Sequence, residues 1–246
     1  MRQITEHIYC MDADAETDQP FIFLIQGQRF SLLADTGNSP ENYRKFLREL
    51  NEAGLKEPDL AVLTHWHWDH TFGACAAECP VIASEETDRI LQRVCAWQWD
   101  DASMRHRLET GEDIPFTYDC MRAQYPDPET IRVTRPDITF RDTMTIDLGG
   151  VVCHLEHRDS PHTRDAVMIH IPKDDVLIGG DAHYEDYYDN DGRYDYGRLA
   201  EFIAYLNGIP FTMYLKGHDE PAMSKNDLLA LLGDALQKLV PESGTA

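Results

Sequence analysis

The sequence has no apolar run close to the roughly 20 residues that a membrane-spanning helix needs. Its first residues, Met1 to His7, also lack the apolar core of a secretory signal. The six cysteines show no C-x-x-C pair or other paired metal spacing. We therefore expect a cytoplasmic protein whose cysteines are reduced and act as small core side chains.

Positive charge is scarce. The chain has 22 basic against 44 acidic residues, which gives a formal charge of -22. The densest basic group, Arg105-His106-Arg107, is short. Such a surface repels nucleic acid phosphates and anionic lipid headgroups. We expect neither nucleic acid nor a membrane as a partner, and nothing in the sequence points to an oligomeric state.

The 246 residues, 42% of them hydrophobic, suit a soluble globular protein with a substantial core. Strands are expected at 4–11, 21–34 and 60–63, with a helix from Ser39-Pro40 to about 53. The second half repeats this order, with strands at 143–147, 151–156, 166–171, 176–178 and 211–215, and helices at 196–206 and from Ser224 to about 239. Two packed sheets with helices outside is the natural architecture.

Residues 84 to about 135 differ in kind from the rest. Ser84 is expected to cap a helix that runs to about Cys95, with further helix around Trp99 and Met104. The stretch 110–136 carries several prolines and aromatic residues and is expected to be irregular. We interpret the chain as a single domain, 1–246, with an insertion at about 84–135 that lies over the site.

The strongest signal is the run His65-Trp66-His67-Trp68-Asp69-His70, which follows an apolar strand. In an extended chain His65 and His67 point to one side, because side chains two residues apart share a face. Asp69 and His70 follow at the turn, before a helix expected to start at about 74–78. One loop can therefore supply two adjacent metal positions. Imidazole and carboxylate suit zinc, and also iron or manganese.

One loop cannot enclose two metals, so further ligands are expected at other strand ends. His162 lies in Ser-Pro-His-Thr, Asp181 follows a buried-strand pattern ending in Gly-Gly, and His218 follows Lys-Gly. Each has small neighbours that allow close backbone approach. The other histidines that compete for a ligand position are His154, His157, His170 and His183.

The motifs His-x-His-x-Asp-His, Pro-His-Thr, Gly-Gly-Asp and Lys-Gly-His, in this order, resemble the metallo-β-lactamase superfamily. Asp35, in Asp-Thr-Gly, matches the first motif of that family, and the resemblance spans roughly residues 20–220. It implies an α/β fold, the αββα sandwich, in which two mixed β-sheets are flanked by helices. It also implies a binuclear metal site at one edge of the sheets.

Carried over residue by residue, the resemblance assigns ligands to two metals. His65, His67 and His162 would hold the first; Asp69, His70 and His218 would hold the second; Asp181 would bridge both. Asp35 would accept a hydrogen bond from the histidine loop. His162 is preferred over the competing histidines because only it has the strand-loop setting and the matching neighbours.

The implied function is that of a binuclear metal-dependent hydrolase. Two divalent ions, Zn²⁺ first with iron or manganese as alternatives, would share a hydroxide that attacks the substrate. Asp69 would orient this hydroxide, and Asp35 would support the site. Tyr184 is the first candidate to donate to the oxyanion, with Tyr187 and Tyr188 as alternatives, and His183 would line the pocket. The expected substrate is a small acyl compound, a thioester, lactone or related ester or amide, as in the glyoxalase II-like and lactonase-like branches.

Two other classes remain open. Similar folds carry redox chemistry: the mono-iron persulfide-oxidising branch keeps the same histidine loop, whereas the di-iron branch places Glu where this chain has His67. The third possibility is a protein that binds metal without turnover. Metal analysis discriminates among them, because one iron per chain favours persulfide oxidation and two zinc ions favour hydrolysis.

Overall fold

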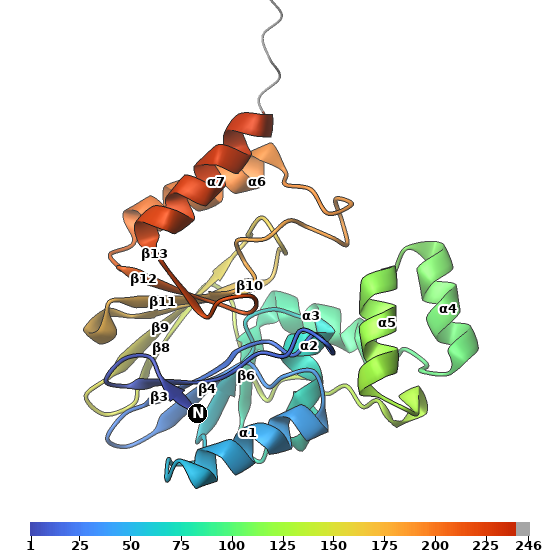
Figure 1. Cartoon of the computed structure of the whole chain (residues 1–246), viewed down its shortest axis with the longest axis horizontal. Helices are drawn as coiled ribbons and strands as arrows, with labels where there is room; N and C mark the ends of the chain where they lie inside the picture. Colours follow the sequence, from blue (N-terminus) through green and yellow to red (C-terminus); the bar gives the residue numbers. More distant parts are fainter. Residues whose placement is uncertain (240–246) are drawn as a thin grey trace, which may run out of the picture.

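Two mixed β-sheets pack face to face, and helices cover their outer faces (Figure 1). The computed structural model describes residues 1–239. The layers run from α1 through one sheet and then the other to α6 and α7 (Figure 1). The predicted αββα sandwich is confirmed.

The first sheet has seven strands in chain order, antiparallel from β1 to β4 and parallel from β4 to β7. They are β1 (Arg2–Gln3), β2 (Ile8–Met11), β3 (Ile22–Gln26), β4 (Ser31–Ala34), β5 (Leu60–Val62), β6 (Val81–Ser84) and β7 (Ile138–Phe140). Because β4 and β5 are parallel, their carboxyl ends lie at the same edge of the sheet.

The second sheet has six strands in the order β13-β12-β11-β10-β9-β8. They are β8 (Thr143–Asp147), β9 (Val152–Arg158), β10 (Ala166–Ile171), β11 (Val176–Gly180), β12 (Met213–Lys216) and β13 (Ala222–Ser224). All neighbours are antiparallel except β11 and β12, which are parallel and end side by side.

Alternation along the strands explains the layers. Phe23 and Ile25 of β3 belong to the core between the two sheets, whereas Leu24 faces the other way. On that outer face it shares a cluster with Phe46 and Leu50 of α1. The period of two residues thus buries both faces of a strand, one against a sheet and one against a helix.

The helices that cover the sandwich begin where the sequence predicts. Ser39 caps α1 (Pro40–Glu52), its hydroxyl accepting from the backbone N–H of Asn42 at 3.1 Å. α6 (Tyr196–Gly208) and α7 (Lys225–Leu239) pack together on the second sheet. Among the helices of the described range, not one combines the length and the apolarity needed to cross a bilayer.

Between β6 and β7 lies a helical segment, whose helices α4 and α5 stand beside the sandwich (Figure 1, green). It comprises α3 (Glu85–Val94), α4 (Asp101–Thr110), α5 (Pro115–Gln124) and the 3-10 turn η2 (Pro128–Thr130). The expectation of irregular chain over 110–136 is wrong at α5. Pro115 fits the first turn of a helix, and Met121 packs in the cluster that holds Trp68 and Phe72. The division into one domain with an insertion stays a prediction.

The chain after the histidine loop turns helical earlier than expected. α2 (Trp68–Thr71) already contains Asp69 and His70, and the 3-10 helix η1 (Phe72–Ala76) continues it. The predicted helix start at 74–78 is therefore wrong. Trp68 and Phe72 bury their rings against the helical segment, which favours the helical turn at this point.

The six cysteines form no disulfide within the described residues. Cys10, Cys120 and Cys153 are buried, as expected of small core side chains. Cys79 is half-buried and packs against the cluster of α1, whereas Cys75 is half-buried outside the clusters and Cys95 is exposed, so the core interpretation is wrong for Cys75 and Cys95. Cys95 follows the last residue of α3, where the chain meets solvent.

Candidate metal centre

The ends of several strands meet at one edge of the sandwich and bring the predicted ligands together. The histidine loop follows β5, Asp181 follows β11 directly, and His218 lies two residues past β12. His162 lies between β9 and β10. The seven predicted ligands form two groups, and within each the ligand atoms lie within 4.8 Å of one another. The first group is His65, His67 and His162; the second is Asp69, His70, Asp181 and His218.

The first group contains imidazoles only. The Nε2 atom of His162 lies 3.0 Å from Nδ1 of His67, and the ring of His65 packs 4.5 Å from that of His67. All three side chains are buried. Burial lowers the pKa of each histidine, and the neighbouring imidazoles lower it further. The first group is therefore neutral near pH 7, the form in which imidazole binds a cation.

The second group pairs imidazoles with carboxylates. The Oδ2 atom of Asp69 lies 2.9 Å from Nε2 of His70 and 3.1 Å from Nε2 of His218. Burial alone would lower the pKa of both histidines, but the carboxylates of Asp69 and Asp181 raise it well above its usual value. Burial likewise opposes ionisation of Asp69 and Asp181, yet the two histidines lower the pKa of both. Without a metal, the second group therefore consists of ionised carboxylates paired with protonated imidazoles.

Asp181 lies between the two groups. Its Oδ2 atom is 3.4 Å from Nε2 of His70 and from Nε2 of His218, and 3.9 Å from Nε2 of His162. No other carboxylate of the described chain contacts histidines of both groups at these distances. This position is compatible with a bridging ligand, and the bridging role of Asp181 stays a prediction.

The donor set fits two divalent cations. Nε2 of His65 and Oδ1 of Asp181 are buried and have no hydrogen-bond partner within residues 1–239. Buried polar atoms normally have a partner, so unpartnered atoms aimed into one cluster indicate that a ligand belongs there. Three imidazoles on one side, and two imidazoles with two carboxylates on the other, suit zinc, iron or manganese.

Asp35 supports the histidine loop through three hydrogen bonds. It follows β4 and adopts a left-handed backbone, with φ 65°. Its carboxylate accepts from the backbone N–H of Thr64 at 2.7 Å and from the hydroxyl of Thr64 at 2.8 Å. The Nδ1–H of His70 donates to the same carboxylate at 2.8 Å. The hydrogen bond expected from the loop to Asp35 is thus present, and it leaves Nε2 of His70 facing the site.

Gly217 lets the end of β12 approach the centre closely. A Cβ atom at this position would lie 2.1 Å from Oδ1 of Asp181 and 2.9 Å from Cε1 of His70. Real Cβ atoms do not tolerate such contacts, so a larger residue would push the His218 loop outward. The motif Lys-Gly-His therefore needs glycine at position 217, because no larger side chain fits between the chain and Asp181.

The loop that carries His162 is fixed by a buried arginine. Arg198, in the first turn of α6, donates through Nε to Asp159 at 2.8 Å and through Nη1 to Asp186 at 2.6 Å. Its Nη2 donates to the carbonyl of Ser160. The Nδ1 of His162 donates to the carbonyl of Glu185 at 2.6 Å. Sequence reasoning missed this network, and an arginine near a helix start gave no signal for it.

The predicted substrate residues occupy three different settings in residues 182–195, here called the tyrosine loop. The Tyr184 hydroxyl donates to Asp219 at 2.7 Å. His183 is 1% exposed, its ring 4.0 Å from that of Tyr184. Tyr188 is partly buried, with its ring 4.9 Å from that of His67, whereas Tyr187 is half exposed. Their roles toward a substrate stay predictions.

Asp18 is a site residue that the sequence did not single out. Its Oδ1 atom lies 3.9 Å from Nδ1 of His218. Burial and then the charge of Asp69 raise the pKa of Asp18 to about 7. The available signal was the acidic run of residues 12–18, which contains Asp12, Asp14, Glu16 and Asp18.

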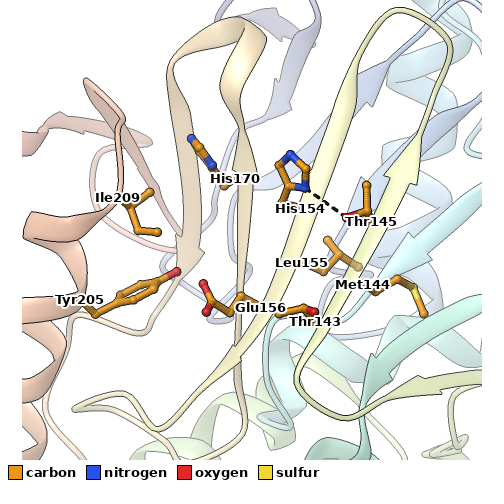
Figure 2. Close-up of a pocket in the computed structure, with 9 residues that line it drawn as sticks. All are labelled: Thr143, Met144, Thr145, His154, Leu155, Glu156, His170, Tyr205 and Ile209. Carbon is orange, nitrogen blue, oxygen red and sulfur yellow. Dashed lines mark hydrogen bonds between the residues drawn. The ribbon is translucent and has the colours of Figure 1, made fainter.

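Two of the competing histidines lie elsewhere, on the outer face of the second sheet. His154 and His170 are paired across β9 and β10 and line a cavity of about 300 Å³ with Glu156 and Tyr205 (Figure 2). His154 contacts the Thr145 hydroxyl at 3.1 Å, and Nε2 of His170 donates to the carbonyl of Pro210 at 2.8 Å. Neither belongs to the two groups at the sheet edge.

Comparison with known proteins agrees with this fold. The family model described as the metallo-beta-lactamase superfamily matches residues 15–75, a range that contains Asp35 and the whole histidine loop. Among solved structures, a metallo-beta-lactamase from Pontibacter korlensis superposes with a TM-score of 0.66 at 18% identity, over 96% of this chain and 97% of that one. A metallo-beta-lactamase family protein from Thermus thermophilus gives 0.65 at 19% identity, over 96% and 81%. The fold is therefore the metallo-β-lactamase fold.

The resemblance of the motifs to the metallo-β-lactamase superfamily is thereby confirmed. A human relative, acyl-coenzyme A thioesterase MBLAC2, is 24% identical over 178 residues. The match covers 67% of this chain and 58% of that protein, so the chain spans little more than half of this relative's length.

Proposed function

We propose that this protein is a metal-dependent hydrolase with two divalent ions, Zn²⁺ first and iron or manganese as alternatives. His65, His67 and His162 would hold one ion, and Asp69, His70 and His218 would hold the other. Asp181 would bridge them. The observation that carries this proposal is the convergence of seven side chains on two adjacent groups joined by one carboxylate.

The residues around the ions have separate tasks in this proposal. When bound, such ions supply a nucleophilic water at neutral pH and polarise the oxygen of the scissile bond. Asp69 would orient the attacking water. Asp35 keeps Nε2 of His70 directed at the site through its hydrogen bond to Nδ1. Tyr188, packed on His67, and Tyr184, near His218, are the candidate donors to the substrate oxygen.

The proposed substrate is a small acyl compound, a thioester, lactone or related ester or amide. The name of the human relative, an acyl-coenzyme A thioesterase, supports the acyl class. The fold alone does not choose among these substrates, because one scaffold hosts many reactions. A cytoplasmic location and the lack of a nucleic acid partner are further parts of this proposal.

Metal analysis of the purified protein, followed by a panel of thioesters, lactones and esters, tests the proposal. We expect two divalent ions per chain and cleavage of at least one panel member. His67→Ala should lower both metal content and turnover, whereas His154→Ala, a histidine outside the two groups, should change neither. One iron per chain would instead support persulfide oxidation. Unchanged metal content and activity in His67→Ala would exclude the proposed centre.

A further inference from the structure

We infer that the opening of the centre is negatively charged and selects an acyl substrate whose leaving group is neutral or positively charged. This inference rests on the proposed function and narrows its substrate class. It sets this chain apart from an enzyme for acyl-coenzyme A, because the coenzyme A leaving group carries several phosphate charges.

The exposure of the ligands shows where a substrate can enter. The His218 side chain is 22% exposed, whereas those of His70, Asp69 and Asp181 are 0%, 7% and 7% exposed. His162 is equally closed, at 6%. Solvent therefore reaches the centre beside His218, and the unpartnered Oδ1 of Asp181 belongs to the same second group.

Carboxylates border this opening. Asp18 lies 3.9 Å from Nδ1 of His218 and is within electrostatic reach of Asp69 and Asp181. Asp219 and Glu220 follow His218 directly and are exposed. The Tyr184 hydroxyl donates to Asp219 at 2.7 Å, which fixes that carboxylate beside the loop.

The loop that carries Asp18 is well defined. Asp14 and Gln19 are joined by two backbone hydrogen bonds, of 3.0 and 2.9 Å, so the chain turns back on itself before Asp18 reaches the opening. Asp18 itself has φ 56°, a left-handed conformation that Asn adopts as readily as Asp. Asp18→Asn therefore removes the charge without disturbing the loop.

Few cations oppose this charge near the opening. Lys216 lies two residues before His218, but it is 7% exposed and buried below the surface. Arg122, on α5, pairs with Asp101 at 2.6 Å. The whole chain carries a formal charge of -22, so the electric field of the protein adds to that of the carboxylates around the opening and does not cancel it.

The binding of three small thiols, which differ only in the functional group at the other end of the molecule, measures this charge without any turnover. Cysteamine is positively charged, 2-mercaptoethanol is neutral and mercaptoacetate is negatively charged. Their binding to the cobalt-loaded full chain is followed by the sulfur-to-cobalt absorption band. The measurements are made at pH 8.

Each thiol is compared with itself on two proteins, so differences in thiol pKa cancel. In Asp18→Asn we expect mercaptoacetate to bind about three- to tenfold tighter and cysteamine to bind weaker by a similar factor, with 2-mercaptoethanol unchanged. Asp12→Asn is the matched control, because it removes one charge from the same loop at an exposed residue paired with Arg2. It should leave all three affinities unchanged.

The outcomes separate this inference from the proposed function. If Asp18→Asn changes the affinities for mercaptoacetate and cysteamine in the same direction, the inferred selection by negative charge is wrong, even if the protein hydrolyses esters. Equal effects of Asp12→Asn and Asp18→Asn on these affinities would also overturn it. Opposite shifts at Asp18 would support it even if no panel member is cleaved. A chain that takes up no cobalt would overturn both.

Turnover gives a second measurement where it occurs. The same acyl group is offered on coenzyme A and on N-acetylcysteamine, which is uncharged. We expect kcat/KM to be more than about tenfold higher for the uncharged thioester at low salt. This difference in kcat/KM should become smaller as added salt screens the carboxylates around the opening. A preference for the coenzyme A thioester would overturn the inference.

Discussion

The two halves of the centre differ in charge although they lie side by side. The first group consists of imidazoles whose pKa values are lowered by burial, so these rings are neutral near pH 7. In the second group carboxylates raise the pKa values of His70 and His218, which therefore hold protons in the metal-free protein. We therefore expect a cation to displace more protons from the second group than from the first.

The difference begins in the local backbone. His65 and His67 precede α2 and are directed together with His162, whereas Asp69 and His70 lie on α2 itself and face the ends of β11 and β12. One short run thus supplies two unlike environments because it changes from a bend at residues 64–66 to the helix α2 halfway.

Removing the shared carboxylate should have the largest effect. In Asp181→Asn both groups lose the residue that lies between them, so we expect less than two metal ions per chain and a loss of activity of more than about 100-fold, since even residues that only support ligands commonly cost 10- to 100-fold. Metal content and kcat measure this. Full retention of two ions would show that Asp181 does not join the groups.

Single-ligand variants should separate the halves. His162→Ala should weaken only the first group and His218→Ala only the second, each leaving about one tightly held ion per chain. Cobalt spectra taken during titration distinguish a site of imidazoles alone from one with carboxylates. Identical spectra for the two variants would contradict the assignment of ligands.

Weakening the hydrogen bond that supports a ligand of the second group should have a smaller effect, and only on metal binding by that group. Asp35→Asn weakens the hydrogen bond to Nδ1 of His70, so we expect the second group to bind metal about 10- to 100-fold more weakly. The first group, which Asp35 supports only through Thr64, should change little. Chelator competition on the His162→Ala and His218→Ala backgrounds reads each group separately.

The two halves should also respond differently to pH. Because the raised pKa values of His70 and His218 keep them protonated near pH 7, metal uptake by the second group should release protons and tighten as pH rises. The lowered values in the first group predict little release between pH 6 and 8. Calorimetry in two buffers of different ionisation enthalpy counts the protons, and equal counts for the two groups would contradict the charge contrast.

Much of the fold follows from local patterns in the sequence. Ser39-Pro40 starts α1 because its cap and first turn are set by adjacent residues. The histidine spacing predicts two groups because side-chain direction depends on local backbone alone. α5 was missed because the prolines around it suggested a break, whereas its helix is stabilised by packing of Met121 near Trp68.

The parts that could not be predicted depend on distant contacts. Asp18, near the start of the chain, reaches His218, near its end, through a loop whose return is set by the bond between Asp14 and Gln19. Arg198 contacts two separate loops, and no spacing in the sequence relates them. The residues that surround the ligands therefore emerge only from the packed chain, although the ligands themselves carry a motif.

Arg198 has a consequence for how the protein moves. One guanidinium links α6 to the loop before His162 and, through Asp186, to the tyrosine loop. His162 in turn bonds to Glu185 in that same loop. We therefore expect the tyrosine loop to stiffen when the first group is occupied, with slower amide hydrogen exchange at 185–189, and Arg198→Gln to uncouple the two. Filling the metal centre and closing the loop beside it would then be a single cooperative event.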